Sequence, residues 1–166
     1  MKRIRNGRSL LASCVVVSML FLLNGALWAQ QKKAPLGEAD GETPGVRVEV
    51  TELKRMSGDT LNLKFVMIND SAKEVDFNYN FTESGHSDID FNSIGGVHLI
   101  DAVDKKKYLV VRDAEKKCVC STGLKTLQPK SRVNLWAKFP APPDGVQKIT
   151  VVIPHFQPMD DVPINR

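Results

Sequence analysis

The chain has 166 residues and a formal charge of +4, from 23 basic and 19 acidic residues. The excess comes from the first 29 residues, which contain Lys2, Arg3, Arg5 and Arg8 and no acid, so the rest of the chain is formally neutral. A neutral domain lacks the counterion release that supports nucleic-acid binding, and we therefore expect no nucleic-acid partner.

The N-terminus has the three parts of a secretory signal peptide. Cations in residues 1–9 precede an apolar run from Leu10 to Leu23, and small residues follow up to Ala29. This order predicts a signal helix that is cleaved after residue 29. The rival interpretation is an uncleaved anchor, because the uncharged stretch has about the ~20 residues that a membrane span needs. Either way we expect export, to the periplasm, the envelope or the medium, with membrane contact only through residues 10–29 if they are retained.

The remaining chain divides into a short linker and one domain. Residues 30–45 are polar, contain two prolines and three glycines, and have no apolar period, which predicts a flexible linker. Residues 46–166 are long enough to form a single domain with its own hydrophobic core.

The clearest strand signal lies at Thr60–Ser71. Apolar side chains alternate with polar ones along its first half, and Asn69-Asp70-Ser71 supplies a turn. We predict a central strand whose core-facing residues are Leu61, Leu63, Phe65 and Met67. The outer face turns apolar at Val66 and Ile68, which predicts that a loop or neighbour covers that end.

Shorter apolar or alternating runs predict the other strands. They fall at residues 46–51, 75–81, 97–100, 108–111, 131–139 and 149–153, the last being the final strand, while residues 82–96 form a long loop. No stretch after residue 30 has a helical period. The fold predicted is therefore all-β, an antiparallel β-sandwich of about seven strands after the N-terminal signal helix.

The order of these motifs resembles a known family. LxLxFxxxNDS at residues 61–71, His98–Leu109, Leu127–Pro143 and KITVVIP at residues 148–154 are similar to immunoglobulin-like (telokin-like) domains of exported bacterial proteins of unknown function. The resemblance covers most of the domain, but its motifs are turns, core positions and a proline stop. It implies an immunoglobulin-like fold and an address outside the cytoplasm, and it carries no catalytic residues.

Cys118 and Cys120 are the sharpest chemical feature. Residues two apart face the same side of a strand, and an oxidising compartment favours a disulfide between them. One interpretation is a tight structural disulfide that fixes a loop. The other is a redox-responsive or metal-contacting pair. The spacing differs from the thioredoxin motif, which separates its cysteines by two residues.

Other chemistry-bearing residues are scattered. Asp88 and Asp90 open with the spacing of a calcium loop, but that loop's glycine and final glutamate are replaced by Ser93 and Leu99, so we expect no metal and no cofactor. His86 lies in the same loop. Trp136 falls on the outward phase of its strand, where it either anchors a partner or is covered by a loop.

These observations predict a fold more closely than a function. We expect an exported, non-catalytic module that binds an envelope or extracellular protein through His86, Asp88, Asp90 and Trp136 together with the loop at residues 118–123. The alternative is a periplasmic redox or metal-handling protein that uses the cysteine pair.

Overall fold

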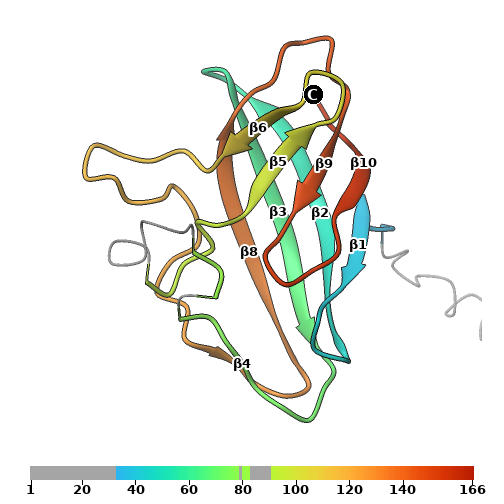
Figure 1. Ribbon diagram of the computed structural model, residues 1–166, viewed down its shortest axis with the longest axis vertical. Coiled ribbons are helices and arrows are strands. Elements are labelled where there is room, and N and C mark those ends of the chain that lie inside the picture. Colours follow the sequence, from blue (N-terminus) through green and yellow to red (C-terminus); the bar gives the residue numbers. More distant parts are fainter. Residues whose placement is uncertain (1–32, 79, 83–90) are drawn as a thin grey trace, which may run out of the picture. The chain divides into compact units, whose positions relative to one another are not determined.

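The structure is a computed structural model that describes residues 33–78, 80–82 and 91–166, and it is all-β over those residues (Figure 1). Its strands are β1 Gly37–Asp40, β2 Val46–Met56, β3 Thr60–Asn69, β4 Val75–Asp76, β5 His98–Asp101, β6 Lys106–Leu109, β7 Thr126–Leu127, β8 Ser131–Pro140, β9 Lys148–Val152 and β10 Met159–Pro163. The prediction of an all-β fold without helices is confirmed for this part of the chain, with ten strands in place of about seven. The predicted signal helix lies outside the described residues.

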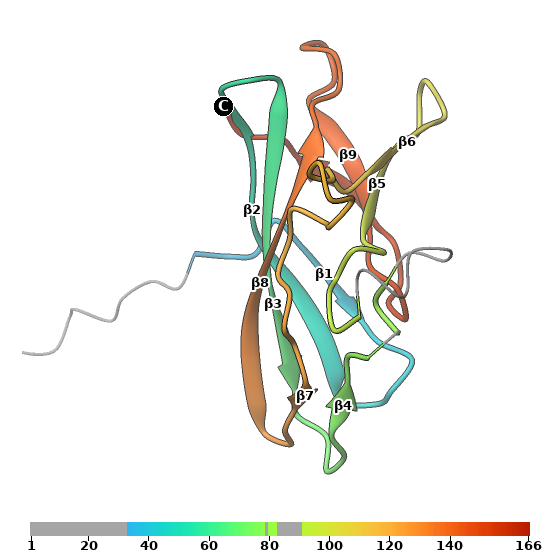
Figure 2. The ribbon, with the colours of Figure 1, turned by 90° about the vertical axis from the view of Figure 1, so that its left-hand side faces the viewer.

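Two four-stranded antiparallel sheets form the body of the domain. Their strand orders are β1-β2-β3-β8 and β10-β9-β5-β6, and a small third sheet pairs β4 with β7. Figure 2 shows the two larger sheets as separate layers. Side chains from both contribute to one buried core, including Phe65 from the first sheet and Leu99 and Val151 from the second.

The predicted central strand is β3, which pairs with β2 on one side and β8 on the other. Its core-facing side chains are at most 1% exposed, as predicted: Leu61, Leu63, Phe65 and Met67. At about 1.5–3 kcal/mol for each large side chain, their burial makes β3 a major contributor to stability. On the opposite face Ile68 is also buried, between Arg47 on β2 and Arg132 on β8.

Asn69 ends β3 and joins it to two later segments. Its side chain is fully buried, and its Nδ2 donates to the carbonyl oxygens of Lys73, Leu127 and Gln128 at 2.7, 3.1 and 3.2 Å. Its Oδ1 accepts from the backbone N–H and the hydroxyl of Ser71. The turn predicted at residues 69–71 is therefore stabilised by the Asn69 side-chain amide, which bonds both the turn itself and the later segment at residues 127–128.

The predicted flexible linker contains a strand, which corrects the boundary at residue 46. Gly37–Asp40 forms β1 and pairs with β2 from Val50 to Arg47. The compact unit accordingly begins at Ala34. The pattern failed here because Ala39 is the one side chain of β1 that is buried, and a single apolar residue gives no alternation.

The strand predicted over residues 75–81 is wrong beyond Asp76. The Asn80 N–H donates to the Phe77 carbonyl at 2.9 Å, and the Asn80 side chain donates to the Asp76 carbonyl, so the chain turns. Phe77 and Phe81 are each 2% exposed, with ring centroids 5.2 Å apart. A turn that places both rings in the core produces the same apolar spacing as a strand. Tyr79 lies outside the described residues.

The strand predicted at residues 149–153 is β9, but it is not the last. Strand β10 follows and pairs antiparallel with β9 across an irregularity between Met159 and Val162. Asp161 has a φ of 56° there. Because this bulge breaks the alternation and the strand ends in a proline, its sequence resembles a loop.

Gly96 allows two backbone segments to approach closely. Its N–H donates to the Phe81 carbonyl at 2.8 Å. A Cβ at this position would lie 2.6 Å from the Thr82 carbonyl oxygen and 2.9 Å from that of Phe81. Only glycine fits this approach, which fixes residues 94–97 against residues 81–82.

Candidate functional site

The cysteine pair lies on a segment that returns to the sheet from an exposed loop. The chain leaves β6, forms a tight turn at residues 113–117 and comes back through residues 118–121. In that turn the Lys116 N–H donates to the Asp113 carbonyl at 3.0 Å, and the Lys117 N–H donates to Asp113 Oδ1 at 2.9 Å. An aspartate that bonds the following backbone is a common way to fix such a turn.

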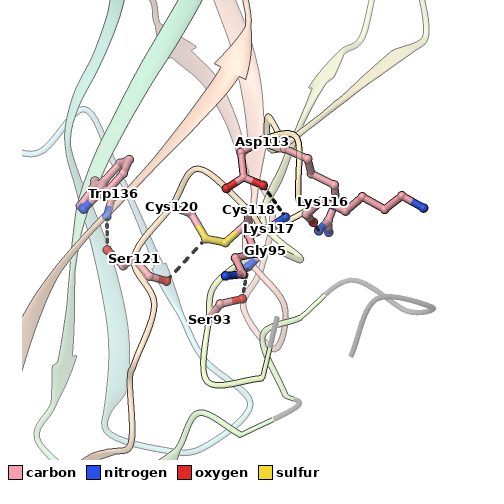
Figure 3. Close-up of a disulfide and its surroundings, with 10 residues drawn as sticks. Ser93, Gly95, Asp113, Lys116, Lys117, Cys118, Cys120, Ser121 and Trp136 are labelled. Carbon is pink, nitrogen blue, oxygen red and sulfur yellow. Dashed lines mark hydrogen bonds between the residues drawn. A yellow bond between two sulfur atoms is a disulfide. The ribbon is translucent and has the colours of Figure 1, made fainter. Parts of the chain in front are cut away.

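Cys118 and Cys120 form a disulfide, with their Cα atoms 5.3 Å apart (Figure 3). The cysteine residues are 7% and 5% exposed, and Cys120 lies opposite the buried Ala137 of β8. Cys120 Sγ is 3.5 Å from the Ser121 carbonyl oxygen. A disulfide sulfur has no proton, so this is a sulfur–oxygen contact. The pairing predicted from the spacing is thus present, and both residues face the core.

Residues 119–121 close the outer edge of β8. The Lys138 N–H donates to the Val119 carbonyl at 3.0 Å, and the Ser121 N–H donates to the Trp136 carbonyl at 2.9 Å. The backbone N–H of Trp136 donates in turn to Ser121 Oγ at 3.0 Å (Figure 3). An open strand edge is a template for pairing with another chain, and this segment protects β8 from it.

Part of the long loop reaches the same region. The Ile94 N–H donates to the Ser121 carbonyl at 3.3 Å, and the Leu124 N–H donates to the Asn92 carbonyl at 2.9 Å. Residues 92–94 therefore lie beside residues 121–124. The three loop residues of that prediction, His86, Asp88 and Asp90, lie outside the described residues.

Trp136 projects from the face of β8 that points away from the core, as predicted from its phase. It is 39% exposed, and Lys64 of β3 stands directly opposite it in the sheet. Lys64 donates to Glu52 of β2 at 3.1 Å. Hydrogen bonds from Lys64 and then from Asn62 hold the pKa of the Glu52 carboxyl below its ordinary value.

A second ion-paired cluster lies on the same face near the β1 edge. Arg47 contacts Asp70 and lies 3.6 Å from Glu49 Oε1. The hydrogen bond to Asp70 is the main cause that raises the pKa of Arg47, which stays charged. Arg47 thus pairs with Asp70 and lies close to Glu49, while Lys64 of β3 pairs with Glu52 of β2.

The contacts of His155 were not predicted from the sequence. Its Nε2 donates to the Asn80 carbonyl at 3.0 Å, and its Nδ1 lies 3.0 Å from Glu42 Oε2. These residues line a cavity of about 230 Å³ whose apolar wall includes Phe81 and Phe156. Glu42, Asn80 and His155 come from three segments far apart in sequence, so no local sequence pattern predicts their contacts.

Several kinds of site are not found in the part of the chain that the structure describes. Over residues 33–78, 80–82 and 91–166, no group of three or more His, Cys, Asp or Glu side chains could hold a metal ion. Nor do those residues include a helix with the length and hydropathy of a membrane span.

Fold and site together define an all-β domain of two antiparallel four-stranded sheets, with a disulfide-closed loop beside an exposed tryptophan. Comparison of the chain with protein-family models, with curated proteins and with solved structures gave no match. The resemblance to immunoglobulin-like domains therefore remains a prediction.

Proposed function

We propose that this protein is an exported, non-catalytic interaction module of the cell envelope, built on an immunoglobulin-like β-sandwich. Two antiparallel four-stranded sheets that share one core fit a sandwich. The basic and apolar N-terminal sequence supports export. The Cys118–Cys120 disulfide fits an oxidising compartment.

The observation that carries this proposal is the exposure of Trp136. Tryptophan is among the residues that most often dominate binding energy in protein interfaces. Here it stands on a strand rather than on a loop, between β3 and the segment at residues 119–121. A binding residue on a rigid element loses little conformational entropy when a partner docks.

A capture experiment tests the proposal. The protein is purified from cells that express the full-length chain, immobilised and incubated with envelope extract. Trp136→Ala is compared with Leu109→Ala, which removes a similarly exposed apolar side chain from β6 in the other sheet. We expect a specific partner that Trp136→Ala loses and Leu109→Ala retains. The same capture by wild type and both variants would contradict a role for Trp136.

The second candidate function is a redox role for Cys118 and Cys120. It is favoured by the bond itself, because a dithiol reductant could reduce it with two electrons and two protons to give two thiols. Both residues are almost buried, however, so a reducing partner must first displace the loop. A thiol count on protein purified without reductant separates the two roles. Two free thiols with stoichiometric bound metal would contradict a structural disulfide.

A further inference from the structure

The outward face of β3 and β8 has a charge pattern that the rest of the sheet lacks. Its side chains include the cations Lys64, Arg132 and Lys138 and no carboxylate, and we name this face the basic strip. We propose that the basic strip docks an extended, acidic polypeptide segment of a partner protein. This inference rests on the proposed function, because it names the partner class for the same surface.

Charge is segregated across the outer face of the first sheet. The outward carboxylates of the first sheet, Glu38, Asp40, Glu49 and Glu52, all lie on β1 and β2. β2 also has the outward cations Arg47 and Lys54, whereas the outward face of β3 and β8 has cations and no carboxylate. Arg47 lies close to Glu49, and Lys64 binds Glu52. By contrast, Arg132 and Lys138 make no ion pair with any residue that the structure describes, and both are exposed. Two uncompensated cations on one strand complement an anionic partner.

The spacing along β8 matches an extended chain. Arg132, Trp136 and Lys138 are three of the four successive outward residues of β8 from 132 to 138, and the two cations are about 20 Å apart at ~3.4 Å per residue. An extended peptide has the same rise per residue as β8. Its acidic side chains can therefore reach both cations while an apolar side chain covers the indole of Trp136. Since residues 119–121 already bond the edge of β8 at Trp136 and Lys138, we expect the peptide to lie along the outward face of β8 there rather than to extend the sheet.

The polar character of the strip favours a polypeptide over an anionic membrane surface. Stable membrane binding needs apolar area that inserts below the headgroups. The strip offers one indole that is 39% exposed, and its immediate neighbours on β3 and β8 include Asn62 and Asn134. An aromatic anchor surrounded by hydrogen-bonding groups and cations is instead typical of a protein interface.

The test uses protein purified from cells that express the full-length chain. The probe is a fluorescent twelve-residue peptide with glutamate at alternate positions and one central leucine, and binding is followed by anisotropy. A second peptide has glutamine in place of every glutamate. The variants are Trp136→Ala, Arg132→Glu and Lys138→Glu, with Lys107→Glu on β6 of the other sheet as the matched charge reversal. All four positions are exposed, so unfolding midpoints are expected to stay unchanged and are measured as a check.

We expect the glutamate peptide to bind and the glutamine peptide not to bind. Each charge reversal on β8 should weaken binding at least tenfold, Trp136→Ala about tenfold, and Lys107→Glu less than twofold. Higher salt should weaken binding further. Two results with the peptide would overturn the inference: no binding of the glutamate peptide, or a loss of its binding in Lys107→Glu as large as in Lys138→Glu. Vesicles of anionic phospholipid that bind with the same dependence on the variants, when the peptide does not bind, would overturn it as well. A Trp136-dependent partner in the capture experiment, without peptide binding, would sink this inference and leave the proposed function standing.

Discussion

Asn69 is the buried polar residue whose loss should be most costly, and Asn69→Ala tests this. The substitution removes two N–H donors shared among three carbonyl oxygens and one acceptor used twice by Ser71. A hydrogen bond contributes about 1 kcal/mol net, and a buried group left without a partner costs about 1–3 kcal/mol. We therefore expect a loss of about 3–4 kcal/mol, a large part of the stability of a typical domain.

Urea unfolding followed by circular dichroism measures this loss. With an m value of about 2 kcal/mol/M, the midpoint should fall by about 1.5–2 M. Asn134→Ala is the control, because it makes the same change at an exposed position of β8 and should cost less than about 0.5 kcal/mol. Asn69→Asp keeps the shape but removes the donors, so it should be at least as destabilising as Asn69→Ala. Equal midpoints for wild type and Asn69→Ala would refute the assigned role.

Three further predictions concern stability. Gly96→Ala should lower the free energy of unfolding, measured in urea, by about 2–3 kcal/mol, because the added Cβ would clash with the backbone of residues 81–82. Gly145→Ala is the control: a Cβ there meets open space, so the free energy of unfolding should change by less than about 0.5 kcal/mol. Replacing Cys118 and Cys120 together by alanine should lower the free energy of unfolding by no more than about 2 kcal/mol, because a crosslink that closes so short a loop restricts the unfolded chain only slightly. A larger loss would show that the bond also stabilises the folded state directly. Because the pKa of Glu52 is lowered in the folded protein, its carboxylate contributes to the free energy of unfolding at neutral pH and loses that contribution as the pH falls through the lowered pKa. Glu52→Gln should therefore lower the free energy of unfolding by up to about 1 kcal/mol at pH 7 and leave it unchanged at pH 2.

Strands that alternate over many residues could be predicted from the sequence. The core-facing residues of β3 and the outward phase of Trp136 on β8 follow from a period of two that runs for about ten residues. Short or irregular strands could not be predicted in this way. β1 has one buried side chain, and β10 contains a bulge at Asp161, so neither shows a regular period.

The candidate site could be predicted only in parts. The spacing of Cys118 and Cys120, together with the export signal, favoured a disulfide but left a redox or metal-contacting pair open, and the structure has the disulfide. The basic strip could not be predicted from the sequence, because Lys64 on β3 joins the cations of β8 only through the pairing of the two strands, which places Lys64 opposite Trp136. His155 gave no signal either, since its partners Glu42 and Asn80 lie 113 and 75 residues away along the chain.

We propose that Trp136 contacts a partner protein outside the cytoplasm. Photo-crosslinking in living cells tests it most directly, with benzoyl-phenylalanine placed at position 136 of the full-length chain and, as a control, at the similarly exposed Leu109 on β6. We predict a light-dependent adduct with one defined envelope protein from position 136 and none from position 109. No adduct from position 136, or the same adducts from both positions, would contradict the account.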